Sequence, residues 1–166
     1  GVPYEKLTPE MMVIVDLQGH IVEGNLRPSV DTKIHLDLYK AFSDLSGIVH
    51  THSTYATAWA QAQKSIPCLG GTHADYFYGE IPCTRPLTEW EVEESFEGDT
   101  GKVIMECFTK KNPLDVPGVL VASHGPFSWG KDCLQAVFNA VVLEELARMA
   151  LLTFQINPEV QSLPQC

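Results

Sequence analysis

Apolar residues near the start of the chain occur in short runs that predict strands. Met12–Asp16 is one such run, and His20–Glu23 follows it after Gly19, a residue suited to a turn. Two short runs separated by a turn residue predict a β-hairpin. Gly47–His52 and Gly118–Ala122 are further apolar runs whose length is typical of buried strands.

Two helices are predicted in the first half of the chain. Residues 32–42 carry apolar side chains at helical spacing, and Asp31 precedes them at the position of an N-cap. Residues 54–63 also have a helical pattern. Strands and helices mixed in this order predict a layered α/β or α+β domain.

The second half of the chain predicts three more helices. Thr88 and Glu91 have the spacing of a capping box for a short acidic helix, and residues 102–110 predict another helix. Asp132 with Gln135 predicts the start of a long helix. Its expected core stripe consists of Leu134, Val137, Phe138, Val141, Val142 and Leu146.

Composition narrows the class of protein. Hydrophobic residues make up 45% of the 166 residues and charged residues 19%, which is typical of a globular chain and fits one domain. The net charge of -10 disfavours nucleic acid and anionic membranes as partners. No apolar run approaches the ~20 residues of a membrane span.

Five cysteines, an odd number without a CxxC pair, argue against a disulfide framework or a zinc ribbon. We therefore expect reduced thiols and a cytoplasmic location.

Three histidines form the main candidate site. His50 and His52 are two apart on a predicted strand, so their rings point to the same side with Cα atoms about 6.5 to 7 Å apart. The alternative is two partly buried polar residues with hydrogen-bond partners. His124 follows an apolar strand and precedes Gly125 and Pro126, which is not a typical setting for a core residue. Three imidazoles with an open position are typical of catalytic zinc.

Two carboxylates are weaker candidates. Asp31 can contribute a fourth ligand or serve only as a helix N-cap. Asp75, within the polar segment Thr72–Gly79 (THADYFYG), can act as a general acid or base or can simply form a turn. His20 and His35 have no comparable setting, and we interpret both as ordinary structural or surface residues.

Four segments resemble one known family in sequence and in order. They are Pro28–Thr32, Gly47–Ser53, Thr72–Gly79 and Ser123–Gly130. They are similar to segments of the class II aldolase/adducin family, and THADYFYG points to its L-ribulose-5-phosphate 4-epimerase branch. The similarity runs over nearly the whole chain.

The resemblance implies a three-layer α/β/α sandwich with a mainly antiparallel central sheet, formed by residues 1–166 as a single domain. It also implies a homotetramer with active sites at subunit interfaces. The family has a segment before Gly1 with a substrate-binding Gly-Asn pair. It also has a segment after Cys166 with a catalytic Tyr that acts across the interface, and this chain contains neither segment.

The same resemblance implies the metal site. A zinc ion is expected at Asp31, His50, His52 and His124, with manganese or cobalt as alternatives. Asp75 matches the catalytic acid/base of the family.

The resemblance also implies a binding site for a phosphorylated pentulose. Gly1 and Ser29 match phosphate-binding positions, and Val30 and Asp31 adjoin them. Epimerases carry a Ser-Ser pair where this chain has Ser29-Val30. Val30 retains its backbone N–H, but one hydroxyl is lost.

The implied reaction interconverts L-ribulose 5-phosphate and D-xylulose 5-phosphate in arabinose-type pentose catabolism. Cleavage of C3–C4 and re-addition of the aldehyde would invert C4, with a metal stabilising the enediolate. One alternative is a class II aldolase, which would be expected to carry a Glu near Asp31; none is adjacent. The other is a catalytically dead adducin-like scaffold, which would not need the three histidines.

Overall fold

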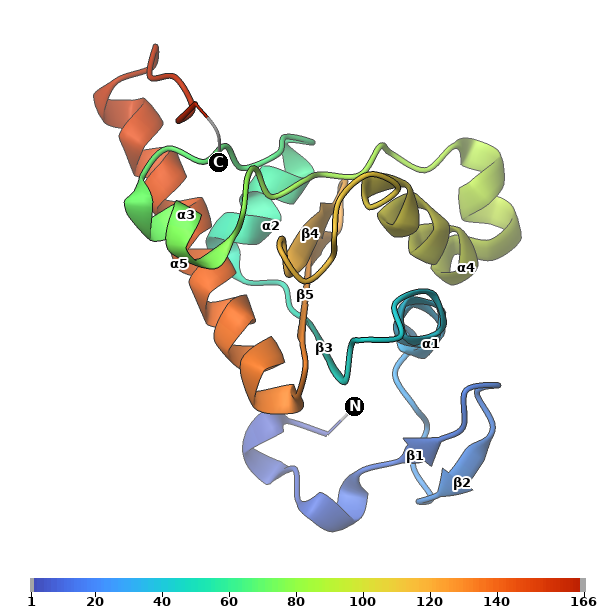
Figure 1. Cartoon of the computed structure of the whole chain (residues 1–166). Helices are drawn as coiled ribbons and strands as arrows, with labels where there is room; N and C mark the ends of the chain where they lie inside the picture. The colour runs from blue at the N-terminus through green and yellow to red at the C-terminus, as the bar shows by residue number, and fades with distance from the viewer. Residues whose placement is uncertain (1, 165–166) are drawn as a thin grey trace.

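A three-stranded sheet lies at the centre of the computed structural model, which describes residues 2–164 (Figure 1). The strand order is β3 (Gly47–His50), β5 (Gly125–Gly130) and β4 (Gly118–Val121), and both pairings are antiparallel. Every residue of β4 and β5 is buried, as expected for strands covered on both faces.

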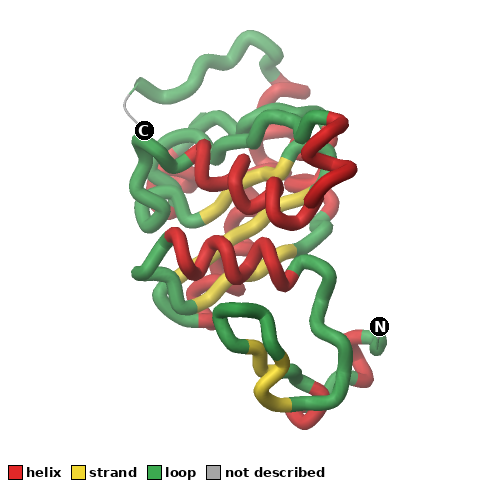
Figure 2. The backbone as a smooth tube through the Cα atoms, turned by 90° about the vertical axis from the view of Figure 1, so that its right-hand side faces the viewer, coloured by secondary structure: helices red, strands yellow, loops and turns green. Residues whose placement is uncertain are grey.

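Helices cover both faces of this sheet. On one face α2 (Thr54–Gln61) and α5 (Cys133–Ile156) pack against the strands. On the other face α1 (Thr32–Ala41) packs against α4 (Glu89–Cys107), and Figure 2 shows the two helices lying across the strands. The short helix α3 (Gly71–Tyr76) packs against α5. The predicted three-layer α/β/α sandwich with an antiparallel sheet is therefore confirmed.

The predicted N-terminal hairpin is also present, although its strands are shorter than expected. β1 (Ile14–Val15) pairs with β2 (Ile21–Glu23) in the antiparallel sense. Gly19 lies in the turn with φ +89°, a left-handed conformation that favours glycine. Two 3₁₀ turns, Tyr4–Lys6 and Pro9–Met11, precede the hairpin.

The core lies between the sheet and the two helical layers. Its largest fully buried side chains include Trp129, Phe127, Phe77, Ile34, Leu38, Leu120 and Leu143. Among the described residues, no helix is both long and apolar enough to cross a membrane.

The helix α5 begins where the sequence predicts, but it buries a different face. Asp132 Oδ1 accepts a hydrogen bond from the Gln135 backbone N–H at 2.7 Å, as expected of an N-cap. Of the predicted stripe, Leu146 is buried and Val142 is partly buried, while Leu134 is 79% exposed. The exposed stripe on α5 consists of Leu134, Val137, Phe138 and Val141. The buried face consists of Ala136, Asn139, Leu143, Leu146, Ala147 and Ala150.

The buried face of α5 is explained by its small and polar residues. Alanines allow the helix to approach the sheet closely. The Asn139 Nδ2 atom donates to the Trp129 carbonyl at 2.7 Å, and Ser128 Oγ donates to the Ala136 carbonyl at 3.1 Å. These hydrogen bonds to β5 fix which side of an extensively apolar helix is buried.

Two other predictions of secondary structure are wrong. The capping box of Thr88 and Glu91 is present, but the helix it starts continues without a break to Cys107. The expected separate helix over residues 102–110 is the end of this α4. In addition, no strand was predicted after His124, whereas Gly125–Gly130 form the central strand β5.

Candidate metal centre

Three separate segments bring the histidine side chains together. His50 is the last residue of β3 and pairs with Phe127 of β5. His124 lies in the turn between β4 and β5. His52 lies beyond the end of β3, so the prediction that both residues of the pair lie on a strand is correct only for His50. A ligand atom from each of the three rings nevertheless lies within 4.8 Å of the others.

The spacing of the rings fits one divalent ion. The Nε2 atoms of His50 and His52 are 3.1 Å apart. Two nitrogens bound to one tetrahedral zinc at 2.0 to 2.1 Å would be about 3.3 Å apart. The ring centroid of His124 lies 4.6 Å and 5.0 Å from those of His50 and His52. The donor set is therefore suited to zinc or a similar divalent ion.

The orientation of His50 is set by the neighbouring strand. Its Nδ1 atom lies 2.9 Å from the Pro126 carbonyl oxygen, which can only accept, so this nitrogen carries the proton. The Nε2 atom is then left as the metal-binding nitrogen. The ring also stacks on Phe127 with the centroids 4.2 Å apart and the planes inclined by 17°.

The turn that carries His124 has an unusual backbone. Ser123 has φ +61°, a left-handed conformation that is uncommon for a residue with a side chain. Its backbone N–H donates to the Ala60 carbonyl of α2, and its hydroxyl oxygen accepts from Gln63 Nε2. These contacts hold the turn in the conformation that directs His124 toward the other two rings.

Gly125 is required by close packing inside the cluster. A Cβ atom at this position would lie 2.8 Å from the Thr51 carbonyl oxygen and 3.1 Å from His52 Cδ2. It would also lie 3.5 Å from His50 Cε1. The absence of a side chain at Gly125 therefore allows the three histidine segments to converge.

Burial keeps the histidines in the form that binds a metal. It is the main cause that lowers the pKa of His50 and of His124 below 6.5, and the other rings of the cluster lower both further. The negative charge of the nearby Asp31 acts in the opposite direction and raises the pKa of both rings. Neutral imidazole is the metal-binding form, so both rings are ready to bind at neutral pH.

Asp31 is near the cluster but does not complete it. It lies at the N-cap position of α1, yet its side chain makes no cap hydrogen bond. Its Oδ2 atom instead accepts from the Ser29 hydroxyl at 3.4 Å. Asp31 therefore occupies the predicted N-cap position without a side-chain cap bond, and its role as a fourth ligand remains a prediction.

Asp75 lies apart from the histidine cluster. It is exposed on α3, and it is absent from the group of described residues whose ligand atoms could hold a metal. His73, two residues earlier, is buried and its Nε2 atom donates to the Gly79 carbonyl at 2.9 Å. This hydrogen bond joins the second and last residues of the THADYFYG segment. It therefore holds this polar segment in a compact conformation.

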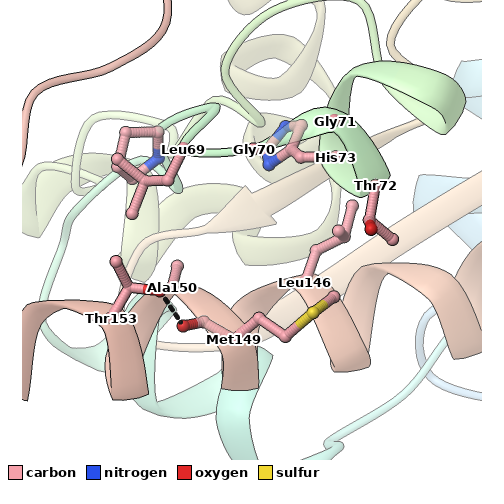
Figure 3. Close-up of a pocket in the computed structure, with 10 residues that line it drawn as sticks. Leu69, Gly70, Gly71, Thr72, His73, Leu146, Met149, Ala150 and Thr153 are labelled. Atoms are coloured by element: carbon pink, nitrogen blue, oxygen red, sulfur yellow. Dashed lines mark hydrogen bonds between the residues drawn. The ribbon is translucent and has the colours of Figure 1, made fainter. Parts of the chain in front are cut away.

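A cavity of about 140 Å³ borders the start of this segment (Figure 3). Leu69 to His73 line one side of it, and Leu146, Met149, Ala150 and Thr153 of α5 line the other. None of the three clustered histidines lines this cavity.

Of the residues predicted to bind the phosphate, Ser29 and Val30 lie in the described part of the chain. Gly1 lies outside the described residues. Ser29 and Val30 are both exposed, and Val30 is 65% exposed. Ser29 lines a groove of about 430 Å³ together with Arg27 and Lys33, which are basic. A cationic groove beside Asp31 is suited to an anionic ligand.

His35 lies beside the histidine cluster, although the sequence analysis interpreted it as an ordinary structural or surface residue. Its ring packs edge-on against Phe127, the residue on which His50 stacks, with 5.7 Å between centroids. Its pKa is lowered by burial and raised by Asp31. The signal was available, because His35 follows Asp31 by four residues and therefore lies on the same face of α1.

Comparison with known protein families matches residues 1–151 to the Class II Aldolase and Adducin N-terminal domain. The chain belongs to the class II aldolase/adducin family. Proteins of this class II aldolase type are typically dependent on a divalent metal, in agreement with the three-histidine cluster.

Solved structures agree with this assignment. An L-fuculose 1-phosphate aldolase is 23% identical with a TM-score of 0.80, and the match covers 99% of this chain and 71% of that one. The corresponding aldolase from Thermus thermophilus is 25% identical, with a TM-score of 0.72 and coverage of 95% and 77%. YgbL from Klebsiella pneumoniae, whose description leaves aldolase, epimerase and decarboxylase open, is 26% identical. Its TM-score is 0.66 and the coverage is 96% and 72%.

Proposed function

We propose that this member of the class II aldolase/adducin family is a metal-dependent L-ribulose-5-phosphate 4-epimerase. It would interconvert L-ribulose 5-phosphate and D-xylulose 5-phosphate in pentose catabolism. The observation that supports this most strongly is the convergence of His50, His52 and His124 within 4.8 Å. Within the family, the THADYFYG segment favours the epimerase over the aldolases.

The chemistry requires a site that stabilises negative charge on substrate oxygens. A divalent ion held by the three imidazoles, with Asp31 as a further ligand, would supply Lewis-acid stabilisation of that charge. Inversion at C4 next to a carbinol carbon needs the C3–C4 bond to break and re-form. The chain must therefore retain the aldehyde fragment, glycolaldehyde phosphate, until its other face adds back.

Ser29 and its neighbours would retain that fragment through its phosphate. Ser29, Val30, Arg27 and Lys33 line the groove, so the Ser29 hydroxyl and the Val30 backbone N–H would donate to the phosphate, and Arg27 and Lys33 would contribute positive charge. Lys33 already forms an ion pair with Asp37 at 2.8 Å, so Arg27 is the more available cation of the two.

Asp75 would exchange a proton with the C4 oxygen as a general acid or base. Because Asp75 is exposed on α3 and is not part of its own chain's histidine cluster, we infer that it acts at the cluster of a neighbouring subunit. This inference agrees with the expectation of a homotetramer whose active sites lie at subunit interfaces.

The surface beside Asp75 supports self-assembly. Tyr76 is 45% exposed and packs edge-on against Phe138, which belongs to the exposed stripe on α5. Contiguous exposed apolar side chains of this kind are typical of interaction surfaces. Asp75 therefore lies at the margin of a surface suited to contact with a second copy.

A sugar-phosphate aldolase is the second candidate function. The fuculose-phosphate aldolases among the similar structures favour it, since an aldolase needs nearly the same metal site. The difference is whether the aldehyde fragment is released. The absence of a Glu adjacent to Asp31 favours the epimerase.

Incubation of the purified protein with each pentulose phosphate, with and without a chelator, distinguishes the two. The epimerase would convert either substrate into the other and would lose activity with the chelator. Accumulation of free glycolaldehyde phosphate without the epimer would assign the protein to the aldolases.

A further inference from the structure

Glu144 is a partly buried carboxylate on α5 that lies outside the histidine cluster but contacts the chain three residues after His52. Its Oε1 atom accepts from the Tyr55 backbone N–H at 2.8 Å, and its Oε2 atom accepts from the Ala56 N–H at 2.8 Å. Both oxygens are thus used on consecutive N–H groups in the first turn of α2, a helix that begins at Thr54.

The start of α2 needs such a partner. The first four N–H groups of a helix have no partner within the helix, and a side chain at the N-cap usually satisfies one of them. Ser53 occupies the N-cap of α2, but its side chain makes no cap hydrogen bond. Glu144 performs this role from a distance of 89 residues in sequence, and its negative charge also suits the N-terminal end of the helix dipole.

This cap matters because α2 begins two residues after His52, a member of the histidine cluster. Residues 51–53, the ligand segment, join the end of β3 to the start of α2 and carry His52. On the β3 side, the Thr51 N–H donates to the Pro126 carbonyl at 3.3 Å, and Pro126 also orients His50. On the α2 side, the carboxylate of Glu144 is the side-chain anchor of the first helical turn.

The anchor is itself rigidly held. Trp59 of α2 donates from Nε1 to the Ala147 carbonyl of α5 at 2.9 Å, so the two helices are joined at a second point. Figure 1 shows α2 beside α5 on the same face of the sheet, and the two helices pack against each other. Movement of the first turn of α2 relative to α5 is therefore restricted at both places.

We propose that Glu144 is a positioning residue for the metal centre, which fixes His52 by holding the start of α2. This inference rests on the proposed metal-dependent function. Loss of the carboxylate leaves two helix N–H groups without their acceptor, so residues 51–53 become more mobile. The His52 ring is then less often placed where it can bind the same metal ion as His50. Residues that support metal ligands typically contribute about 10- to 100-fold to metal affinity.

The test compares Glu144→Ala with Glu145→Ala in the full chain. Glu145 is the next residue on α5, but its side chain is 56% exposed and pairs with Arg148 at 3.8 Å. Titration with Co²⁺ measures affinity by calorimetry, and the visible absorption spectrum reports the coordination geometry of the same ion. Both are recorded well below the melting temperature of each variant, so that a role in stability alone does not change them.

We expect Glu144→Ala to weaken Co²⁺ binding by about tenfold or more and to change the spectrum, while Glu145→Ala leaves both unchanged. If Glu144→Ala does not fold, Glu144→Gln replaces it. The amide keeps one carbonyl acceptor but presents an NH₂ group to the other helix N–H, so weaker binding is again expected.

A wild-type affinity and spectrum in either folded Glu144 variant would overturn the inference and leave the proposed function intact. Failure of the wild-type protein to bind Co²⁺ would instead overturn the proposed function, and this inference with it.

Discussion

The Nε2 atoms of His50 and His52 lie 3.1 Å apart, although β3 ends at the first of these residues. The pair is brought together by the end of a strand and the segment that follows it. His124 completes the group from the turn between β4 and β5. The arrangement of the three rings is suited to one divalent ion, and contacts from distant residues hold the rings in place.

We expect His50→Ala to remove the bound metal. The substitution deletes one of three nitrogen donors, so affinity should fall by at least about 100-fold, with little activity remaining. Metal content measured by plasma emission after dialysis gives the result. The control is His20→Ala, because His20 is exposed and pairs with Asp16 of the hairpin turn, away from the histidine cluster. Equal metal content in His50→Ala and the wild type would contradict the assignment.

Gly125→Ala should damage the same site without removing a ligand. The new methyl group would be forced against the Thr51 carbonyl and the His52 ring, so one of the converging segments must move. We expect weaker metal binding and a loss of stability of about 1 to 3 kcal/mol, measured by calorimetry and urea unfolding. Gly70→Ala is a matched control, since a Cβ there meets nothing within 4 Å. Equal metal affinity in both variants would show that the close packing at Gly125 is unimportant.

Asp75→Asn should reduce turnover by about 10²- to 10⁴-fold with metal content and folding unchanged. Asparagine keeps the shape of the side chain but cannot take up a proton at neutral pH. On the same sample, steady-state kinetics measures turnover, metal analysis measures metal content and circular dichroism measures folding. Loss of metal together with activity would instead make Asp75 a ligand or the support of one.

Mixing two inactive variants tests whether Asp75 acts across an interface. Asp75→Asn keeps the histidines, and His50→Ala keeps the carboxylate. Random hybrid oligomers should contain intact shared sites at about a quarter of their interfaces, so co-refolding should restore activity. No recovery, with hybrid formation verified by mass spectrometry, would place Asp75 and the metal in one chain.

The stability of the metal-free protein should stay level above about pH 6.5 and should fall as the pH is lowered from there to about 5.5. Burial lowers the pKa of His35 and of His73 below 6.5, so the folded state binds protons less readily than the unfolded chain. Their contribution is complete above about pH 6.5 and is lost as the pH falls through the folded-state values. Each group contributes at most about 1.4 kcal/mol per pH unit. Urea unfolding with a chelator measures the effect, and His73→Gln should reduce it; a stability that rises toward pH 5.5 would contradict this account.

Much of the fold could be predicted from sequence because several signals are local. The hairpin at Gly19, the capping box of Thr88 and the N-cap at Asp132 depend on residues a few positions apart. The strand β5 was missed because Gly125, Pro126 and Gly130 have low strand propensity. Pairing on both sides and complete burial override that propensity.

The buried face of α5 and the surroundings of the site could not be predicted for a different reason. Apolar residues occur on more than one side of α5, so periodicity alone does not indicate which side faces the sheet. The three histidines were found because two are close in sequence and one precedes a glycine. The role of Glu144 depends on a contact across 89 residues, and no local pattern reports such a contact.

The most direct measurement follows the hydrogen on C4 during epimerisation in D₂O. Cleavage and re-formation of the C3–C4 bond leaves that hydrogen attached to its carbon. The account therefore predicts that L-ribulose 5-phosphate gives D-xylulose 5-phosphate without deuterium at C4, and only when divalent metal is present. Formation of the epimer with deuterium at C4 would contradict the account. Epimerisation by the chelated His50→Ala variant at the rate of the metal-loaded wild type would also contradict it.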